Sequence, residues 1–403
     1  MPSLDPSKIN WQDTALNAAG PTCLIIRAWL QPVGDLDRFQ PSGFPEIGHV
    51  IYDAPRSDGS KEKVCIVDSP ASMANHLETV CLDGPTAGLH PDLANLPYVR
   101  CVTDMDGDVS QEKPPSRIVV TTLTEGHRLA SDYFLDGQVN PQWRPATTTQ
   151  KKNKKVEAVP ARWEGEGFRD MLRRDFGIKE VKKDKTYFIW PDTWWTIYRT
   201  IFNYDPNSLV HGVMFAKEQI KVSRLLTAHL EAFGAARVGR SGVKFDRLGK
   251  TTSGQPIFAV EDETANSIVA TFIIDLALLR SYGRDNNGLS IEQKRMLLDL
   301  AVWKIKRLLQ FPFRFRSGCQ LTCTGIASRD DTDSDVVPNS GTGNAKDINV
   351  DIAASITACK LTRQITDVYY PTTKLFKIGD ESEQKPTADD GSEEPNGDEP
   401  LEE

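Results

Sequence analysis

Three observations predict an α+β fold for this chain of 403 residues. Short segments rich in β-branched and aromatic residues are concentrated in the first third of the chain, and a long capped helix follows in the C-terminal half. Strands and helices mix without a regular β–α–β rhythm, which argues against a doubly wound sheet. Hydrophobic content of 39% and charged content of 26% are ordinary for a globular protein that buries a core.

The first strands are indicated by their composition. Residues 22–31 (TCLIIRAWLQ) form the first expected strand, residues 49–52 the second and residues 63–67 the third. A further strand is expected at 117–123 (RIVVTTL). Between the first and the second strand, the sequence QPSGFP predicts a turn.

The segment CIVDSPASMANHLETVC, residues 65–81, predicts a strand that turns into a short helix with one polar face. Ser69 is placed to cap this helix and Pro70 to begin it. The polar stripe, at i, i+3, i+4 and i+7, consists of Ser72, Asn75, His76 and Thr79. The apolar stripe consists of Met73, Leu77 and Val80. Small neutral hydrogen-bonding groups near a helix N-terminus suit a phosphate or sugar backbone, although an ordinary solvated face is the alternative.

Further along the chain, residues 144–185 carry thirteen Lys or Arg against seven Asp or Glu, and Lys151–Lys155 holds the densest cluster. This segment reads as a loop that projects from the body, either functional or merely solvated. After it, strands are expected at 189–202, 208–215 and 312–323. Helices are expected at 224–233, 263–282 and 290–310, the last with a capping box of Ser290 and Gln293.

The overall charge of −8 conceals an uneven distribution. Eleven acidic residues and one lysine lie in 380–403, so residues 1–379 carry a net charge of +2. The tail should be disordered, and the body does not exclude an anionic partner. The N-terminus lacks a signal architecture, the most apolar run (268–279) is too short for a bilayer, and seven cysteines at scattered spacings indicate reduced thiols. We therefore expect a cytoplasmic protein with no membrane partner.

Known catalytic motifs are missing from the sequence. It contains no phosphate-binding or dinucleotide-binding glycine motif, no GxSxG and no paired histidines. Cys319 with Cys323 and the acidic run 330–335 are weak metal candidates, and a buried thiol pair and a solvated loop are the better interpretations. We expect no cofactor, no metal and no catalytic residue, and read the chain as a binding protein.

Seven motifs occur in order along the chain: RFQPSGFPEIGHVIYDAP, DSPASMANHLETVC, LPYV, TTLTEGHRLASDYF, SLVHGVMF, SGVKFDRLG and LALLRSYG. Together they resemble the RAMP backbone subunit of CRISPR type I-U (also called I-G) effector complexes, the Cas-seven group. The resemblance covers residues 23–323, about three quarters of the chain.

This resemblance implies a ferredoxin-like (RRM-type) RAMP core with thumb-like and helical insertions. Residues 1–379 would form one crRNA-binding domain with a basic insertion at about 140–188, and 380–403 the acidic tail. Copies would stack along the crRNA, kink it at intervals and present it for pairing with target DNA, beside other Cascade subunits in a prokaryotic cytoplasm. The subunit would not cut nucleic acid.

The resemblance also implies the RNA-binding residues, which lie in four segments. These are Arg38, Gln40, Ser42, Gly43 and Phe44; Ser72, Met73, Asn75 and His76; His127 and Arg128; and Arg240, Lys244 and Arg247. Phe44 and Met73 are candidate wedges between bases, or core residues. His76 departs from the family, which usually carries arginine there, so one permanent charge is lost.

Two alternatives remain open at this point. One is a metal-independent RAMP endoribonuclease that processes CRISPR repeat RNA through His127 or His76. The other is a scaffold whose acidic tail recruits a basic partner.

Overall fold

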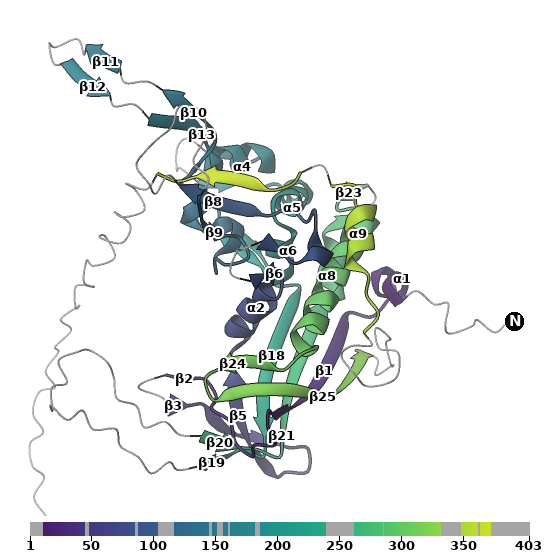
Figure 1. Cartoon of the computed structure of the whole chain (residues 1–403). Coiled ribbons are helices and arrows are strands. Elements are labelled where there is room, and N and C mark those ends of the chain that lie inside the picture. The colour runs from purple at the N-terminus through teal and green to yellow at the C-terminus, as the bar shows by residue number, and fades with distance from the viewer. Residues whose placement is uncertain are drawn as a thin grey trace, which may run out of the picture.

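The computed structural model in Figure 1 describes residues 11–44, 48–84, 88–103, 117–144, 147–150, 156–159, 162–181, 186–238, 262–284, 286–331, 348–361 and 363–371. The predicted tail at 380–403 and the basic cluster 151–155 lie outside these residues. The α+β class is confirmed, because a large curled antiparallel sheet is combined with several helices.

The largest sheet has seven strands, and each strand is antiparallel to its neighbours. Across the sheet their order is β24 (Phe313–Arg316), β25 (Cys319–Asp330), β1 (Cys23–Pro32), β21 (Ser267–Asp275), β18 (Leu226–Phe233), β5 (Lys61–Asp68) and β4 (Ile51–Pro55). The predicted N-terminal strands are therefore confirmed, with β1 in the interior of the sheet. Ile26 of β1 pairs with Phe272 on one side and Ser328 on the other.

A second sheet of five strands lies at the other end of the molecule (Figure 1). Its order is β13 (Arg162–Gly167), β10 (Gln138–Arg144), β26 (Thr366–Tyr369), β8 (Val99–Thr103) and β9 (Arg117–Thr121). Only the β26–β8 pair among them is parallel. Beyond β10 and β13, the hairpin of β11 (Thr147–Gln150) and β12 (Val156–Val159) extends away from the body. The segment predicted as a projecting loop thus contains a β-hairpin arm.

The other strands within the described ranges form six two-stranded sheets. They are β2 (Gly43–Phe44) with β3 (Gly48–His49), β6 (Leu82–Asp83) with β7 (Gly88–Leu89), β14 (Lys179–Val181) with β15 (Thr186–Phe188), β16 (Val213–Phe215) with β17 (Ile220–Val222), β19 (Ala236–Val238) with β20 (Asp262–Thr264), and β22 (Gly283–Arg284) with β23 (Asn287–Gly288).

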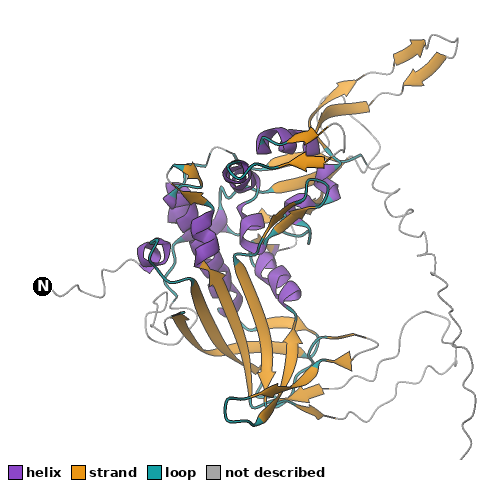
Figure 2. Ribbon diagram, turned by 180° about the vertical axis from the view of Figure 1, so that it is seen from behind, coloured by secondary structure: helices purple, strands orange, loops and turns teal. Residues whose placement is uncertain are grey.

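Helices α2 and α8 cover one face of the seven-stranded sheet, with α2 packed on β18 and α8 on β21. The helices are α1 (Trp11–Leu16), α2 (Pro70–Thr79), α3 (Asp132–Leu135), α4 (Phe168–Phe176), α5 (Thr193–Tyr204), α6 (Pro206–His211), α7 (Leu276–Ser281), α8 (Ile291–Leu309) and α9 (Ile352–Ala358). The inward residues of β1, such as Ile26 and Ala28, are fully buried beneath them, while Arg27 and Trp29 point to the opposite face. Seen from behind in Figure 2, that opposite face is formed by the strands themselves.

The long helix α8 confirms the prediction for 290–310. Ser290 caps it by accepting from the Gln293 backbone N–H, and the Gln293 side chain accepts from the Ser290 N–H in return. Most of its residues between Met296 and Leu309 are buried, so α8 passes through the core rather than along the surface.

Two predicted helices are wrong. Residues 224–233 form strand β18, whose side chains alternate between buried and half-buried along the strand. Residues 263–282 form β20, β21 and the single short helix α7. In both cases the alternation of apolar residues decides the structure, because each strand is enclosed between two others in the sheet.

Two predicted strands are also wrong. Residues 189–202 mostly belong to α5, in which Ile197, Ile201 and Tyr204 are buried on one side at helical spacing. Residues 208–215 end helix α6 and then form β16, with Gly212 between them at φ +80°. The strand expected at 312–323 is a hairpin of β24 and β25, which turns at Gly318 with φ +80°.

Helix α9 and strand β26 lie in the C-terminal part of the chain, where the sequence analysis predicts no helix or strand. Among the helices of the described ranges, none combines the length and the apolar character that crossing a bilayer requires.

The capping box of α8 makes a first prediction. Ser290→Ala should lower the free energy of unfolding by about 1 kcal/mol, because the Gln293 N–H loses its acceptor. Urea denaturation measures this change. Ser57→Ala, at an exposed turn position, is the control and should change the free energy by less than about 0.5 kcal/mol. Equal effects of the two substitutions would contradict the role of the cap.

Candidate nucleic-acid interface

Helix α2 forms as its sequence predicts. The Ser69 Oγ accepts from the Ser72 backbone N–H at 3.2 Å, and Pro70 occupies the first helical turn. Met73 and Leu77 are buried, whereas Asn75 and Thr79 are exposed and Ser72 and His76 are half-buried. The polar stripe of α2 therefore faces outward, with its backbone N–H groups at one end. We call this stripe the α2 face.

The turn at 38–44 lies next to the start of α2, which sequence separation alone does not show. The Ser42 backbone N–H donates to Val67 O at 2.8 Å, at the end of β5. The Gln40 N–H donates to Gly318 O at 2.9 Å, in the turn between β24 and β25. Phe39 is buried and pairs through its backbone with Glu263. The side chain of Arg38 is 53% exposed and lies 3.3 Å from an Asp262 carboxylate oxygen.

His76, the position that departs from the family, is held by neighbours on β24 and β5. Its Nε2 lies 3.2 Å from Asp68 Oδ2. Its ring makes edge contacts with Phe313 and Phe315, at centroid distances of 5.0 and 5.4 Å. His76 is thus directed along the protein surface toward Asp68, and 21% of its side chain stays exposed.

Asp68 is the buried anion at this flank of α2. Burial by itself raises its pKa, but hydrogen bonds from His76, Ser72 and the Ser69 N–H outweigh burial and leave the pKa below its ordinary value. The Arg316 guanidinium approaches the same carboxylate at 3.4 Å. Sequence reasoning predicts no role for Asp68 or Phe313, because His76 lies far along the chain from Phe313 and Asp68 far from Arg316.

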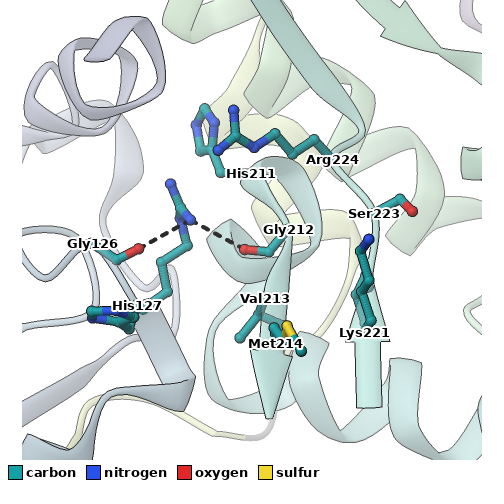
Figure 3. A pocket seen from close by; sticks show the side chains of 11 residues that line it. Gly126, His127, His211, Gly212, Val213, Met214, Lys221, Ser223 and Arg224 are labelled. Carbon is teal, nitrogen blue, oxygen red and sulfur yellow. Dashed lines mark hydrogen bonds between the residues drawn. The ribbon is translucent and has the colours of Figure 1, made fainter. Parts of the chain in front are cut away.

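The other flank of α2 carries a buried ion pair. Arg128 donates from Nε to Glu78 Oε1 at 2.6 Å and from Nη2 to Glu78 Oε2 at 2.9 Å. It also donates to the carbonyls of Gly126 and Gly212, the two dashed bonds in Figure 3. With 8% of its side chain exposed, Arg128 acts structurally here, and its contact with RNA stays a prediction.

His127, the neighbour of Arg128, has the opposite environment. Its side chain is 83% exposed, and its Nδ1 lies 2.9 Å from Glu125 Oε1. His127 is therefore available at the surface, on the Arg128 side of the α2 face.

A buried polar network continues from Glu78 into α6 and α8. The Asn207 amide donates to Glu78 Oε1 at 2.6 Å, and Lys304 of α8 donates to the Asn207 carbonyl oxygen. Asp205 lies nearby, fully buried, with one oxygen accepting from the Ser208 hydroxyl at 2.6 Å. Burial raises the pKa of Asp205 to about 6, since the hydrogen bond from Ser208 only partly compensates.

The structure thus brings three predicted segments together and leaves others apart or undescribed. The 38–44 turn lies at the start of α2, and the 127–128 loop contacts the last turn of α2 through Glu78. Met73 is fully buried, so of the two roles considered for it the structure shows the core role. Gly43 lies in β2, and the side chain of Phe44 and the residues Arg240, Lys244 and Arg247 lie outside what the structure describes.

The weak metal candidates gain no support in the described part of the chain. No three His, Cys, Asp or Glu side chains there are grouped to hold a metal ion. Cys319 is buried, and burial raises the pKa of its thiol to about 12. All seven cysteines are free thiols, as predicted.

Comparison of the sequence with models of known protein families identifies the family to which this chain belongs. The family model of CRISPR-associated protein GSU0053 matches residues 24–237, just over half of the chain. The chain belongs to this CRISPR-associated family. No curated protein matches the sequence. In this member of the family, the matched segment contains the 38–44 turn, α2, the 126–130 loop and the β16–β17 hairpin.

The ion pair beneath the α2 face predicts a stability effect. Arg128→Met should lower the free energy of unfolding by roughly 3–5 kcal/mol, because it leaves Glu78 as an unpaired buried charge. Arg128→Met combined with Glu78→Gln should regain a large part of this loss, since Glu78 is then no longer a charge that has lost its ion-pair partner. Chemical denaturation measures both variants, and an equal loss in the two would contradict the ion-pair explanation.

Asp205 predicts a pH effect. Its raised pKa means that the folded state binds a proton more tightly than the unfolded state, so this residue stabilises the fold less as the pH rises from 4 to 6. The free energy of unfolding of Asp205→Asn, measured relative to that of the natural protein, should therefore rise by up to about 3 kcal/mol between pH 4 and pH 7. Denaturation at several pH values within that interval measures the difference, and a difference independent of pH would refute the shift.

Proposed function

We propose that this CRISPR-associated protein is a non-catalytic crRNA-binding backbone subunit of a type I-U/I-G Cascade-like interference complex. It polymerises along the crRNA with other copies of itself, contacts further Cascade subunits and presents the guide for pairing with target DNA in antiviral defence. The observation that carries the proposal is the convergence of three distant segments around the α2 face. These are the 38–44 turn, the β24–β25 hairpin and the 126–128 loop.

The chemistry of this surface suits an RNA backbone read without regard to sequence. Neutral hydrogen-bonding groups line the centre of the α2 face, the Arg316 guanidinium lies at one flank, and the exposed ring of His127 lies on the side of the other. Such a surface holds phosphates and sugars and makes no selective contact with base edges. Modest affinity per subunit then adds up along the strand when several copies bind side by side.

Strand order supports a ferredoxin-like core. In chain order, β1, β18, β21 and β25 occupy the second, fourth, third and first places of a four-stranded antiparallel unit within the sheet. Helix α8 makes the connection from β21 to β25, and α2 lies in the connection from β1 to β18. This order and these connections agree with the β–α–β–β–α–β arrangement of ferredoxin-like domains, to which β4, β5 and β24 would be additions.

The arm supports contact with a neighbouring copy. The β11–β12 hairpin lies well beyond the body in Figure 1 and joins the body through β10 and β13. An extended hairpin of this kind reaches a neighbouring subunit or its RNA in a filament, as the thumb of the RAMP subunits is expected to do.

Endoribonuclease activity is not part of this proposal. His76 is bound to Asp68 and packed between phenylalanine rings, and His127 pairs with Glu125 at the surface. Labelled repeat RNA incubated with the purified protein and EDTA should stay intact.

RNA association tests the proposed function. The protein, co-expressed with a CRISPR array and purified, should elute as an RNA-containing assembly with an A260/A280 ratio above that of pure protein. Elution as an RNA-free monomer would overturn the proposal.

A charge placed on the α2 face should weaken binding. Asn75→Asp puts a carboxylate on the exposed centre of α2, so its affinity for labelled single-stranded RNA of mixed sequence should fall several-fold through repulsion of phosphates. Asn287→Asp makes the same change at an exposed position of β23 and should leave the affinity unchanged. Fluorescence anisotropy measures both affinities. If the two variants bind RNA equally well, α2 is not part of the RNA interface.

A further inference from the structure

A cavity of about 400 Å³ lies on the Arg128 side of α2 (Figure 3). It is lined by the 126–128 loop, by residues 211–214 and by residues 221–224 of the β16–β17 hairpin and the segment after it. None of these except His127 and Arg128 was predicted as a site residue. We call this cavity the His211 pocket.

His211 lines this pocket and carries a buried ring N–H that has no hydrogen-bond partner among the described residues. Its side chain is buried, with 1% exposed, and its Nε2 lies 2.9 Å from the Lys304 ammonium. Because Lys304 donates, Nε2 accepts and the ring proton is on Nδ1. This Nδ1–H has no acceptor among the described residues. A buried donor without a partner is rare in folded proteins and points to an acceptor supplied from outside the chain.

The surroundings of His211 are strongly positive. Burial is the main cause that lowers the pKa of His211 well below its ordinary value, and the charges of Lys304, Arg128 and Arg224 lower it further. The ring is therefore neutral and keeps its tautomer at physiological pH. Glu78 and Asp205 lie near Arg128 and Lys304 and balance their charges, so Arg224 is the cation near His211 that is left to attract an anion.

Two of the lining cations are not neutralised by the protein. Glu78 balances Arg128, but within the described ranges neither Lys221 nor Arg224 forms an ion pair with a carboxylate. Arg224 instead donates to the Pro70 carbonyl at 3.4 Å, which places it beside the first turn of α2. In Figure 3, Arg224 lies next to His211, Ser223 lies between Arg224 and the end of β17, and Lys221 lies on β17.

We propose that the His211 pocket binds one phosphate group of a nucleic-acid strand that lies along α2. The Nδ1–H of His211, the Arg224 guanidinium, the Ser223 hydroxyl and the Lys221 ammonium supply the donors. Met214, 61% exposed at the edge of the pocket, offers an apolar contact to the attached nucleoside. This inference rests on the proposed function. It identifies where the RNA strand continues after it leaves the α2 face.

Two lysines of the same hairpin provide a matched test. Lys221 lines the pocket, whereas Lys217, which is also exposed, does not. Lys221→Gln should weaken binding of fluorescein-labelled single-stranded RNA of mixed sequence several-fold. It should also reduce the slope of log K against log salt by about one, as expected for one lost phosphate contact. Lys217→Gln should leave affinity and slope unchanged.

If Lys221→Gln behaves like Lys217→Gln while the natural protein binds RNA, the pocket proposal is wrong and the proposed function stands. If the natural protein binds no RNA, the proposed function fails first. A second readout follows the ring itself, through the Nδ1 signal of His211 in nitrogen NMR spectra. The signal should move when RNA is added to the natural protein and should stay in place in Arg224→Gln. An Nδ1 signal unmoved by bound RNA would also overturn the pocket.

Discussion

The arrangement of this molecule depends on one buried carboxylate, that of Glu78. It accepts two hydrogen bonds from Arg128 and one from Asn207, which in turn accepts from Lys304. A single charge thereby joins α2, the 126–128 loop, α6 and α8. A buried charge without its partners is destabilising by several kcal/mol, so none of these elements can shift alone. The α2 face is presented outward because the opposite side of the helix is fixed in this way.

The two flanks of α2 are built on different principles. On the β24 side, Asp68 contacts both His76 and Arg316. The aromatic rings of Phe313 and Phe315 fix the orientation of the histidine ring. On the other side, Glu78 neutralises Arg128 and leaves Arg224 and Lys221 to face solvent. Positive charge is thus placed asymmetrically about a neutral helix face.

Sequence reasoning predicted local features well and long-range ones poorly. Helix α2 and helix α8 follow from capping residues and apolar spacing, signals that lie within a few residues of each other. Strand β18 was mistaken for a helix because LTAHLEAF is rich in good helix formers, although its apolar residues alternate. The sheet overrides this propensity by enclosing the segment between β5 and β21.

The candidate site shows the same division. The polar stripe of α2 could be read from spacing, because it lies on one helix. The partners of His76 and the burial of Arg128 could not, since Phe313 lies 237 positions from His76 along the chain and Glu78 lies 50 positions from Arg128. For His211, SLVHGVMF resembled a strand, and only the helix that ends at His211 turns this ring toward Lys304.

The position of β1 has a consequence for how the chain folds as it is synthesised. Both neighbours of β1, strands β21 and β25, come from beyond residue 266. They also lie outside the segment that the family model matches. During translation, β1 therefore cannot pair with either neighbour until more than two hundred further residues have been synthesised. Closing such distant pairings is slow, and an exposed apolar strand is prone to aggregate meanwhile. Slow refolding of the isolated chain is the expected consequence of this strand order.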